Sequence, residues 1–172
     1  MAQQRDDAVE RTSLHQKIDH LLIEARVILP GAQALLGFQL AIVLTEAFAA
    51  LSPAVKLVHG AALCCSALSI ILLMALAAYH RIAYDGEDVA AFHRTGSRYL
   101  TVATLPLALS LSCDVFVVGT RIVGSSLAAA GAAFAVLGLL VGCWIILPLI
   151  ARQRRSGQRF MGSDTRAPTP IG

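Results

Sequence analysis

Four long apolar stretches dominate the pattern of hydrophobic and polar positions along the chain. They cover approximately residues 30–51, 55–79, 99–118 and 126–150. About 20 helical residues cross a hydrocarbon core about 30 Å thick, and only helices or closed barrels satisfy their own backbone in lipid. Barrel strands alternate over about ten residues, whereas these stretches are continuously apolar. The pattern therefore predicts an all-α fold, an up-down bundle of four transmembrane helices over residues 30–151.

The segment before the first apolar stretch has the spacing of an amphipathic helix. Its apolar residues recur every three or four positions, and Ser13 is a typical first capping residue. Pro30 is expected to end this helix, because proline disfavours helical geometry in the residue before it. We therefore expect residues 1–12 to form a flexible tail and residues 13–29 to lie along the inner membrane surface, with an elbow into the first span. The alternative is one long helix kinked at Pro30.

The basic residues are divided unevenly between the two ends of the predicted bundle. Of the 14 Lys and Arg residues, only Lys56 and Arg121 lie in the connections after the first and third spans. Arginine-rich flanks stay in the cytoplasm, so both termini are expected there. We expect the tail 152–172 to be disordered and to anchor this orientation, with anionic lipid binding as the alternative. The arginines of this tail are Arg152, Arg154, Arg155, Arg159 and Arg166.

Composition agrees with lipid as the main solvent. Hydrophobic residues make up 56% of the chain and charged residues 15%, whereas soluble domains carry about 25% charged residues. The four cysteines lie inside the apolar stretches without CxxC spacing, so we expect buried apolar fillers and neither a zinc site nor a disulfide framework. No nucleophile elbow, phosphate loop or facing histidine pair is present. We expect no catalytic site, metal, cofactor or nucleic acid partner.

The fourth stretch carries a regular series of small residues. At about 100° per residue, spacings of four and three place the whole series on one narrow helix face. A face of this kind lets another helix backbone approach closely in lipid. Packing inside one protomer and formation of a homodimer both remain open at this point. The residues are Gly124, Ala128, Gly131, Ala135, Gly138 and Gly142.

Ionisable residues near the ends of the spans opposite the termini form a second candidate site. They are Glu46, His59, Asp114 and Arg121. Gln39 and Ser66 lie seven residues from Glu46 and His59, and Ser110 lies four residues from Asp114, so each shares a helix face with its neighbour. Ionisable groups inside a membrane usually have partners or a task. We interpret the cluster as a structural ion pair or interfacial set, with solute or proton handling as the alternative.

Several motifs resemble a bacterial family of small four-helix membrane proteins of unknown function. They are "EARVILPGAQALLGFQL", whose Leu-Pro-Gly and following Gln are the most specific part, "AAYHR" at the end of the second span, Asp114, and "LPL" at the end of the fourth. The similarity covers approximately residues 14–155. It implies a bacterial cytoplasmic membrane and this topology, and it supplies no activity, substrate or catalytic residue.

The sequence thus favours a non-enzymatic membrane protein that packs or self-associates through its fourth span. Its expected role is that of an accessory, scaffold or envelope-stress component. The alternative is a small transporter or channel subunit that uses the ionisable cluster.

Overall fold

All secondary structure in the described part of the chain is helical, as predicted. The computed structural model describes the backbone of residues 2–83, 90–151 and 153, and the side chains of residues 15–83, 95–151 and 153. Its elements are α1 (Ala2–Val43), α2 (Glu46–Ala49), α3 (Pro53–Ala83), α4 (Ala90–Val123), α5 (Ser126–Val141) and the π-helical turn η1 (Gly142–Ile146), which continues α5.

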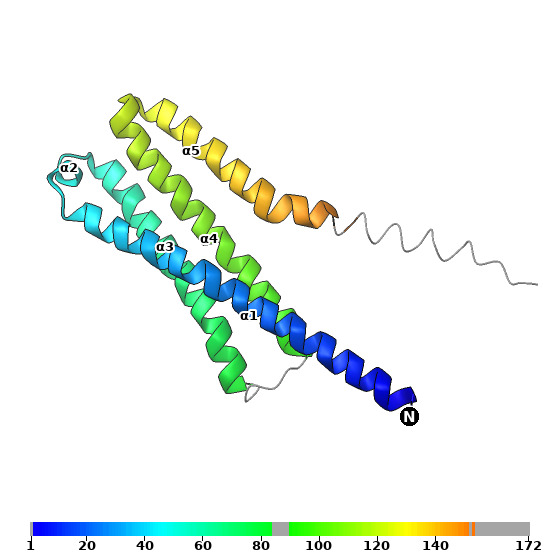
Figure 1. Ribbon diagram of the computed structural model, residues 1–172. Coiled ribbons are helices and arrows are strands. Elements are labelled where there is room, and N and C mark those ends of the chain that lie inside the picture. Colours follow the sequence, from blue (N-terminus) through cyan, green and yellow to red (C-terminus); the bar gives the residue numbers. More distant parts are fainter. Residues whose placement is uncertain (1, 84–89, 152, 154–172) are drawn as a thin grey trace, which may run out of the picture.

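Four helical segments are long and apolar enough to cross a membrane, which confirms the predicted number of spans, although the first one ends at Val43 and not near residue 51. They are His15–Val43, Pro53–Ala83, Thr95–Val123 and Ser126–Ala151. Consecutive long helices run in opposite directions (Figure 1). α1, α3 and α4 contact one another, and α5 packs along α4 at the edge of the group. The short α2 lies at the end where α1 joins α3, which we call the α2 end.

The expected elbow at Pro30 is wrong, because α1 is one continuous helix with Pro30 inside it. It begins at Ala2, so residues 2–12 are helical and do not form the expected tail. A proline removes one backbone hydrogen bond, but helices in membranes tolerate this loss where neighbouring helices pack against them. With 42 residues, α1 is about 63 Å long. It therefore extends well beyond a hydrocarbon core of about 30 Å.

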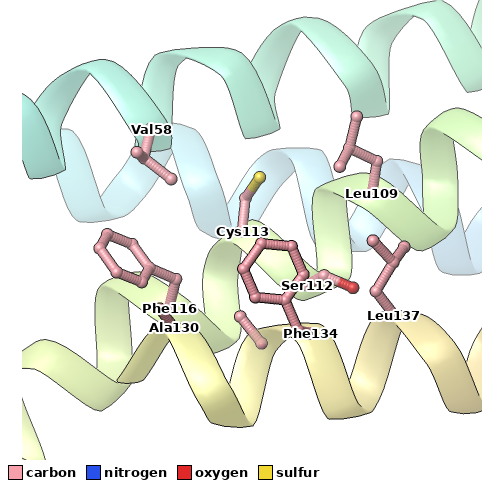
Figure 2. A pocket seen from close by; sticks show the side chains of 9 residues that line it. Val58, Leu109, Ser112, Cys113, Phe116, Ala130, Phe134 and Leu137 are labelled. Atoms are coloured by element: carbon pink, nitrogen blue, oxygen red, sulfur yellow. The ribbon is translucent and has the colours of Figure 1, made fainter. Parts of the chain in front are cut away.

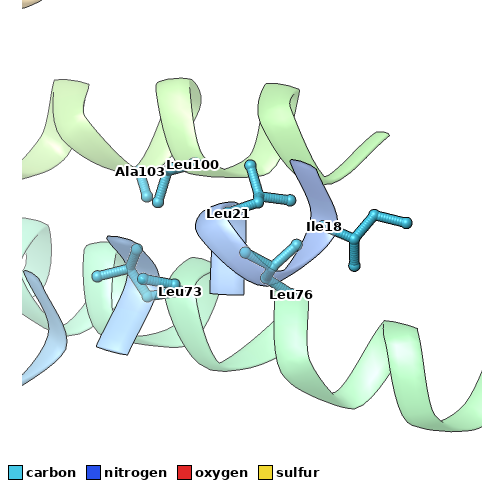
Figure 3. Packing of buried hydrophobic residues seen from close by; sticks show 7 residues of the cluster. Ile18, Leu21, Leu73, Leu76, Leu100 and Ala103 are labelled. Carbon is cyan, nitrogen blue, oxygen red and sulfur yellow. The ribbon is translucent and has the colours of Figure 1, made fainter. Parts of the chain in front are cut away.

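The apolar side chains of α1 from Ile18 to Ala25 pack against α3 and α4 and so do not form the surface-lying face that we expected. Figure 3 shows Ile18 and Leu21 of α1 close to side chains of both other helices. Ile18 is fully buried, and the cluster is one of two apolar cores in the described residues. Its buried members are Ile18, Leu21, Ala25, Leu73, Leu76, Leu100 and Ala103.

Side-chain caps and one glycine shape the connections next to α2 and α5. The Thr45 hydroxyl accepts a hydrogen bond from the Phe48 amide at the start of α2, and the Ser125 hydroxyl accepts one from the Ala128 amide at the start of α5. Gly124 has a φ of +68° in the turn between α4 and α5, a conformation that glycine adopts without steric cost. The expected disordered tail, 152–172, lies outside the described residues apart from residue 153, and so does the loop 84–89.

The cysteines are only partly the buried fillers that we expected. Cys65 and Cys113 are half-buried, whereas Cys64 and Cys143 lie exposed on the outer faces of their helices. A small apolar side chain suits a helix face in lipid as well as a packed interior, and periodicity within a continuously apolar stretch does not separate the two.

Candidate functional site

Buried polar side chains gather between α1, α3 and α4 towards the α2 end. Gln39, four residues before the end of α1, is 2% exposed, and His59, near the start of α3, is 1% exposed. Ser66 and Ser110 are fully buried, and Asp114 of α4 is half-buried. α1 ends, α3 begins and α4 ends towards α2, and the three helices turn these side chains towards one another. We call the five residues the polar cluster.

The side-chain amide of Gln39 joins α1 to α4. Its Nε2 donates one hydrogen bond to Ser110 Oγ over 2.8 Å and another to Asp114 Oδ2 over 2.6 Å. Both amide hydrogens are therefore used. The amide oxygen, Gln39 Oε1, has no hydrogen-bond partner among the described residues.

Ser110 connects all three helices through its hydroxyl group. Its oxygen donates to the Ala62 carbonyl of α3 over 2.9 Å and lies 2.6 Å from Ser66 Oγ. Since the single hydroxyl hydrogen of Ser110 points to Ala62, Ser66 must be the donor in the second bond. One turn further along α3, Ser69 donates to the Ala103 carbonyl of α4 over 2.8 Å. These bonds set the register between α3 and α4 where a hydrophobic effect between helices does not operate.

His59 is placed between α1 and α4 by its two ring nitrogens. Its Nε2 lies 3.0 Å from the backbone carbonyl of Gln39, and its Nδ1 lies 3.9 Å from Asp114 Oδ1. The Phe48 ring of α2 packs edge-on against the imidazole, with 5.1 Å between the ring centroids. His59 is thereby held on one side by a hydrogen-bond acceptor and on the other by a carboxylate.

Two basic side chains hold α2 over the polar cluster. Lys56 Nζ donates to the Ala49 carbonyl over 2.8 Å, and the Arg121 guanidinium donates to the Ala47 carbonyl. Cations near the free carbonyls of a short helix interact favourably with them. α2 is thus fixed to the start of α3 and the end of α4, with Phe48 packed against His59.

Of the four predicted ionisable residues, the structure brings two together. His59 and Asp114 face each other in the polar cluster. Glu46 lies exposed in the first turn of α2, and Arg121 is exposed and binds a backbone carbonyl of α2, as described above. Within the described residues, no group of three or more His, Cys, Asp or Glu side chains has the arrangement of a metal site.

The amide and the hydroxyls that complete the polar cluster were visible in the sequence only as neighbours of the ionisable residues. Seven-residue spacing placed Ser66 on the face of His59, and four-residue spacing placed Ser110 on the face of Asp114. Gln39 shared a face with Glu46, but it bonds to Asp114 because α1 ends at Val43, before Glu46. Ser69 had no signal, since a lone serine in an apolar stretch is common.

The small-residue face of α5 points away from α4. Ala128, Gly131, Ala135 and Gly138 are exposed. A Cβ added at Gly131 or Gly138 would meet no atom within 4 Å, and the same holds at Gly142, which begins η1. Gly124 lies in the preceding turn and therefore outside the helix. Packing within the protomer, one of the two interpretations of this face, does not occur in the described residues.

α5 instead contacts α4 through its opposite side. Ala129 is 1% exposed, and a Cβ added at Gly119 of α4 would lie 3.0 Å from the Ala129 Cβ. Beside this contact, residues of α3, α4 and α5 line an open apolar hollow of about 270 Å³. Figure 2 shows the phenyl rings of Phe116 and Phe134 and the thiol of Cys113 around it. Its lining offers no pair of titratable groups for chemistry.

A second hollow, of about 370 Å³, lies between α1, α4 and η1 at the end opposite α2. Glu24, Ile28, Thr104, Leu107 and Trp144 line it. Glu24 is its single titratable lining residue and is itself exposed. The polar cluster therefore remains the place where titratable groups of different helices meet.

Comparison with known proteins places the chain in a family and reveals no activity. The searches of curated proteins and of solved structures found no match. Residues 7–148 match a family described as a family of unknown function, DUF6328. This match includes all of α3, α4 and α5 and most of α1, and it agrees with the resemblance noted from the sequence motifs. The chain belongs to the DUF6328 family of unknown function.

Proposed function

We propose that this protein is a non-enzymatic membrane protein that self-associates through the small-residue face of α5. In this role it serves as an accessory, scaffold or envelope-stress component of a bacterial cytoplasmic membrane. The proposal rests on the observation that no described part of the protomer covers this face. Ala129 is the one residue of the fourth span, Ser126–Ala151, that is buried within the protomer, whereas 33% of the most apolar stretch is buried in each of the second and third spans.

The chemistry of the face favours another helix as its neighbour. Gly131 and Gly138 expose backbone, and Ala128 and Ala135 add only methyl groups between them. In lipid, helices associate through close van der Waals packing, and small residues allow the backbones to approach. A second copy would place the same face opposite itself around a two-fold axis, the commonest symmetry of homo-oligomers.

Substitution of Gly138 tests this proposal. Gly138→Leu adds a branched side chain to the centre of the face, so the dimer should weaken on the order of tenfold. The measurement is Förster transfer between two labelled populations in vesicles at increasing protein density. Gly37→Leu is the matched control, because Gly37 is also exposed and a Cβ there meets no atom within 4 Å. Equal transfer in both variants and the unmutated protein, or no transfer in any, contradicts self-association through this face.

We also propose that both termini lie in the cytoplasm and that the α2 end faces outward. The distribution of arginine supports this orientation, as argued from the sequence. The arginine-rich tail that follows α5 then anchors the protein at the inner surface, where anionic lipids attract basic residues.

A small transporter or channel subunit is the second candidate function. One observation favours it: His59 and Asp114, from different helices, converge at membrane depth. A carrier of protons or ions would lose its flux in proteoliposomes when Asp114 is replaced by Asn, and Glu46→Gln would leave the flux unchanged because Glu46 lies outside the polar cluster. An unmutated protein that carries neither protons nor common ions rules this candidate out.

A further inference from the structure

We propose that His59 and Asp114 together bind one proton, which reaches them from the α2 end. The site combines an imidazole nitrogen of α3 and a carboxylate oxygen of α4, 3.9 Å apart. It is independent of self-association, because α5 contributes no residue to it.

Hydrogen bonding defines which atom of His59 is open to the proton. A backbone carbonyl only accepts hydrogen bonds, so the Nε2 atom that faces the Gln39 carbonyl must carry a hydrogen. In a neutral imidazole, Nδ1 is then a bare lone pair. This atom is buried, has no hydrogen-bond partner among the described residues, and faces Asp114 Oδ1. Two acceptors therefore face each other over 3.9 Å, and a proton on either of them turns this contact into an attractive one.

Charge explains why the pair takes one proton. With a neutral imidazole and an ionised carboxylate, the pair carries one negative charge inside the membrane, which is costly even with the Gln39 amide as a donor. One proton makes the pair neutral overall, as imidazolium with carboxylate or as imidazole with carboxylic acid. A second proton would leave a positive charge instead. Because the two groups interact, the proton belongs to the pair.

The other charged groups near the polar cluster are engaged elsewhere. On α2, Glu46 is exposed. Lys56 of α3 and Arg121 of α4 bind carbonyls of α2. α1 contributes the uncharged Gln39 amide, and the neighbouring Cys113 lines the apolar hollow towards α5. His59 and Asp114 are thus the groups that exchange the proton.

The arrangement of side chains leaves a route to one end of the molecule. Away from α2, the connected hydroxyls end at Ser66, and Ser69 donates separately to the Ala103 carbonyl. The buried residues beyond are apolar: Ile70, Leu73, Leu76, Leu100, Ala103 and Leu107. Towards α2, the Phe48 ring packs edge-on against the imidazole. The proton comes from water at the α2 end, forms one N–H or O–H bond, and leaves by the same route, so the site loads and unloads without carrying protons across.

Magnetic resonance of the protein in lipid vesicles tests the proton directly. With ¹⁵N in the histidine rings and ¹³C in the aspartate carboxyls, we expect either an imidazolium at His59 or a carboxylic acid at Asp114 near neutral pH. Asp114→Asn should leave His59 as neutral imidazole with hydrogen on Nε2, and Glu46→Gln should leave the His59 and Asp114 signals unchanged. Neutral His59 beside ionised Asp114 throughout about pH 5 to 8 overturns the proposal. So does imidazolium that persists in Asp114→Asn.

The kinetics of proton exchange test from which end of the molecule the proton reaches His59 and Asp114. When the pH changes on the α2 side of oriented vesicles, the signals of the pair should respond, whereas a change on the other side should have no effect. Phe48→Ala should speed this response several-fold, while Phe38→Ala should not, because Phe38 is 70% exposed on α1 away from the polar cluster. A response to the opposite side, or equal rates in both variants, contradicts access past Phe48. Transport across the membrane is measured separately as flux, so its absence leaves the proton site intact.

Discussion

At the scale of single residues, the side chains of Gln39 and Ser110 link three helices through hydrogen bonds. The Gln39 amide supplies two donors, and both are used in bonds from α1 to α4. The Ser110 hydroxyl supplies one donor and accepts two bonds, which ties α4 to α3 and α1. In a lipid environment no water replaces a lost partner. A buried polar group of the cluster is therefore costly to leave unpaired.

Gln39→Leu should destabilise the protein by about 1–3 kcal/mol, because it removes the amide that donates to Asp114 and is one of the two donors to Ser110. Gln33→Leu should have little effect, since Gln33 is exposed on the same helix and leucine suits lipid. The measurement is reversible unfolding of both variants in mixed micelles. Similar stability of the two variants would mean that the Gln39 bonds do not hold the helices together.

At the scale of elements, the segment of α1 before Pro30 shows why an amphipathic pattern does not distinguish a surface helix from a packed one. An apolar stripe packs equally well on the acyl region of a membrane surface or on two neighbouring helices. The stripe of Ile18, Leu21 and Ala25 was interpreted as the first kind, and it is the second. Pro30 supported the wrong choice, because its local preference for a break is weaker than the packing on both sides of it.

Ile18→Ala should destabilise the protein by about 2 kcal/mol or more, because it opens a cavity in a packed cluster. Ile23→Ala serves as the matched control: Ile23 is 53% exposed, whereas Ile18 is fully buried. Thermal unfolding in detergent distinguishes the two variants. If α1 lay on the membrane surface in this region, both variants would unfold like the unmutated protein and would lose affinity for lipid instead.

At the scale of the whole molecule, the four spans are buried to different extents. α1, α3 and α4 enclose the apolar cores and the polar cluster, whereas α5 adds one side to α4 and leaves the other open. Most buried residues of the described chain therefore lie in three helices, which is the basis for the proposal that α5 binds a second copy. The proton site and the association face lie on different helices, so variants of one leave the other unaltered.

The orientation of the whole molecule is expected to follow its arginines. Reporter fusions at the N-terminus and after the last residue should both be active in the cytoplasm, and a cysteine introduced at Ser52 should react with a membrane-impermeant thiol reagent from outside. Ser52 is suitable because it is exposed in the connection between α2 and α3. A cysteine-free background removes the reaction of Cys64 and Cys143, which are exposed on their helices. If the reagent labels this cysteine only from the cytoplasmic side, the predicted orientation is wrong and the α2 end faces the cytoplasm.

The polar cluster was predictable in its depth and only partly in its membership. Helix spacing and the topology together put Glu46, His59, Asp114 and Arg121 near one level. The rotation of each helix about its axis then decides which side chains point into the polar cluster. Neighbouring residues of a helix point about 100° apart, so sequence spacing alone does not fix this rotation. The break in the helix at Leu44 and Thr45 separates Glu46 from α1. This is why Gln39 reaches Asp114 and Glu46 does not.

The sequence by itself determined the helical class and the number of spans, whereas the first span ends at Val43 and not near residue 51. These properties depend on the local balance between apolar and polar residues over about 20 positions, which lipid imposes on any spanning helix. Only the tertiary structure decided that α1 continues through Pro30, that Gln39 joins His59 and Asp114, and that the small-residue face of α5 stays open. Those outcomes depend on which helix faces meet, a property of pairs of helices that no single stretch of sequence contains.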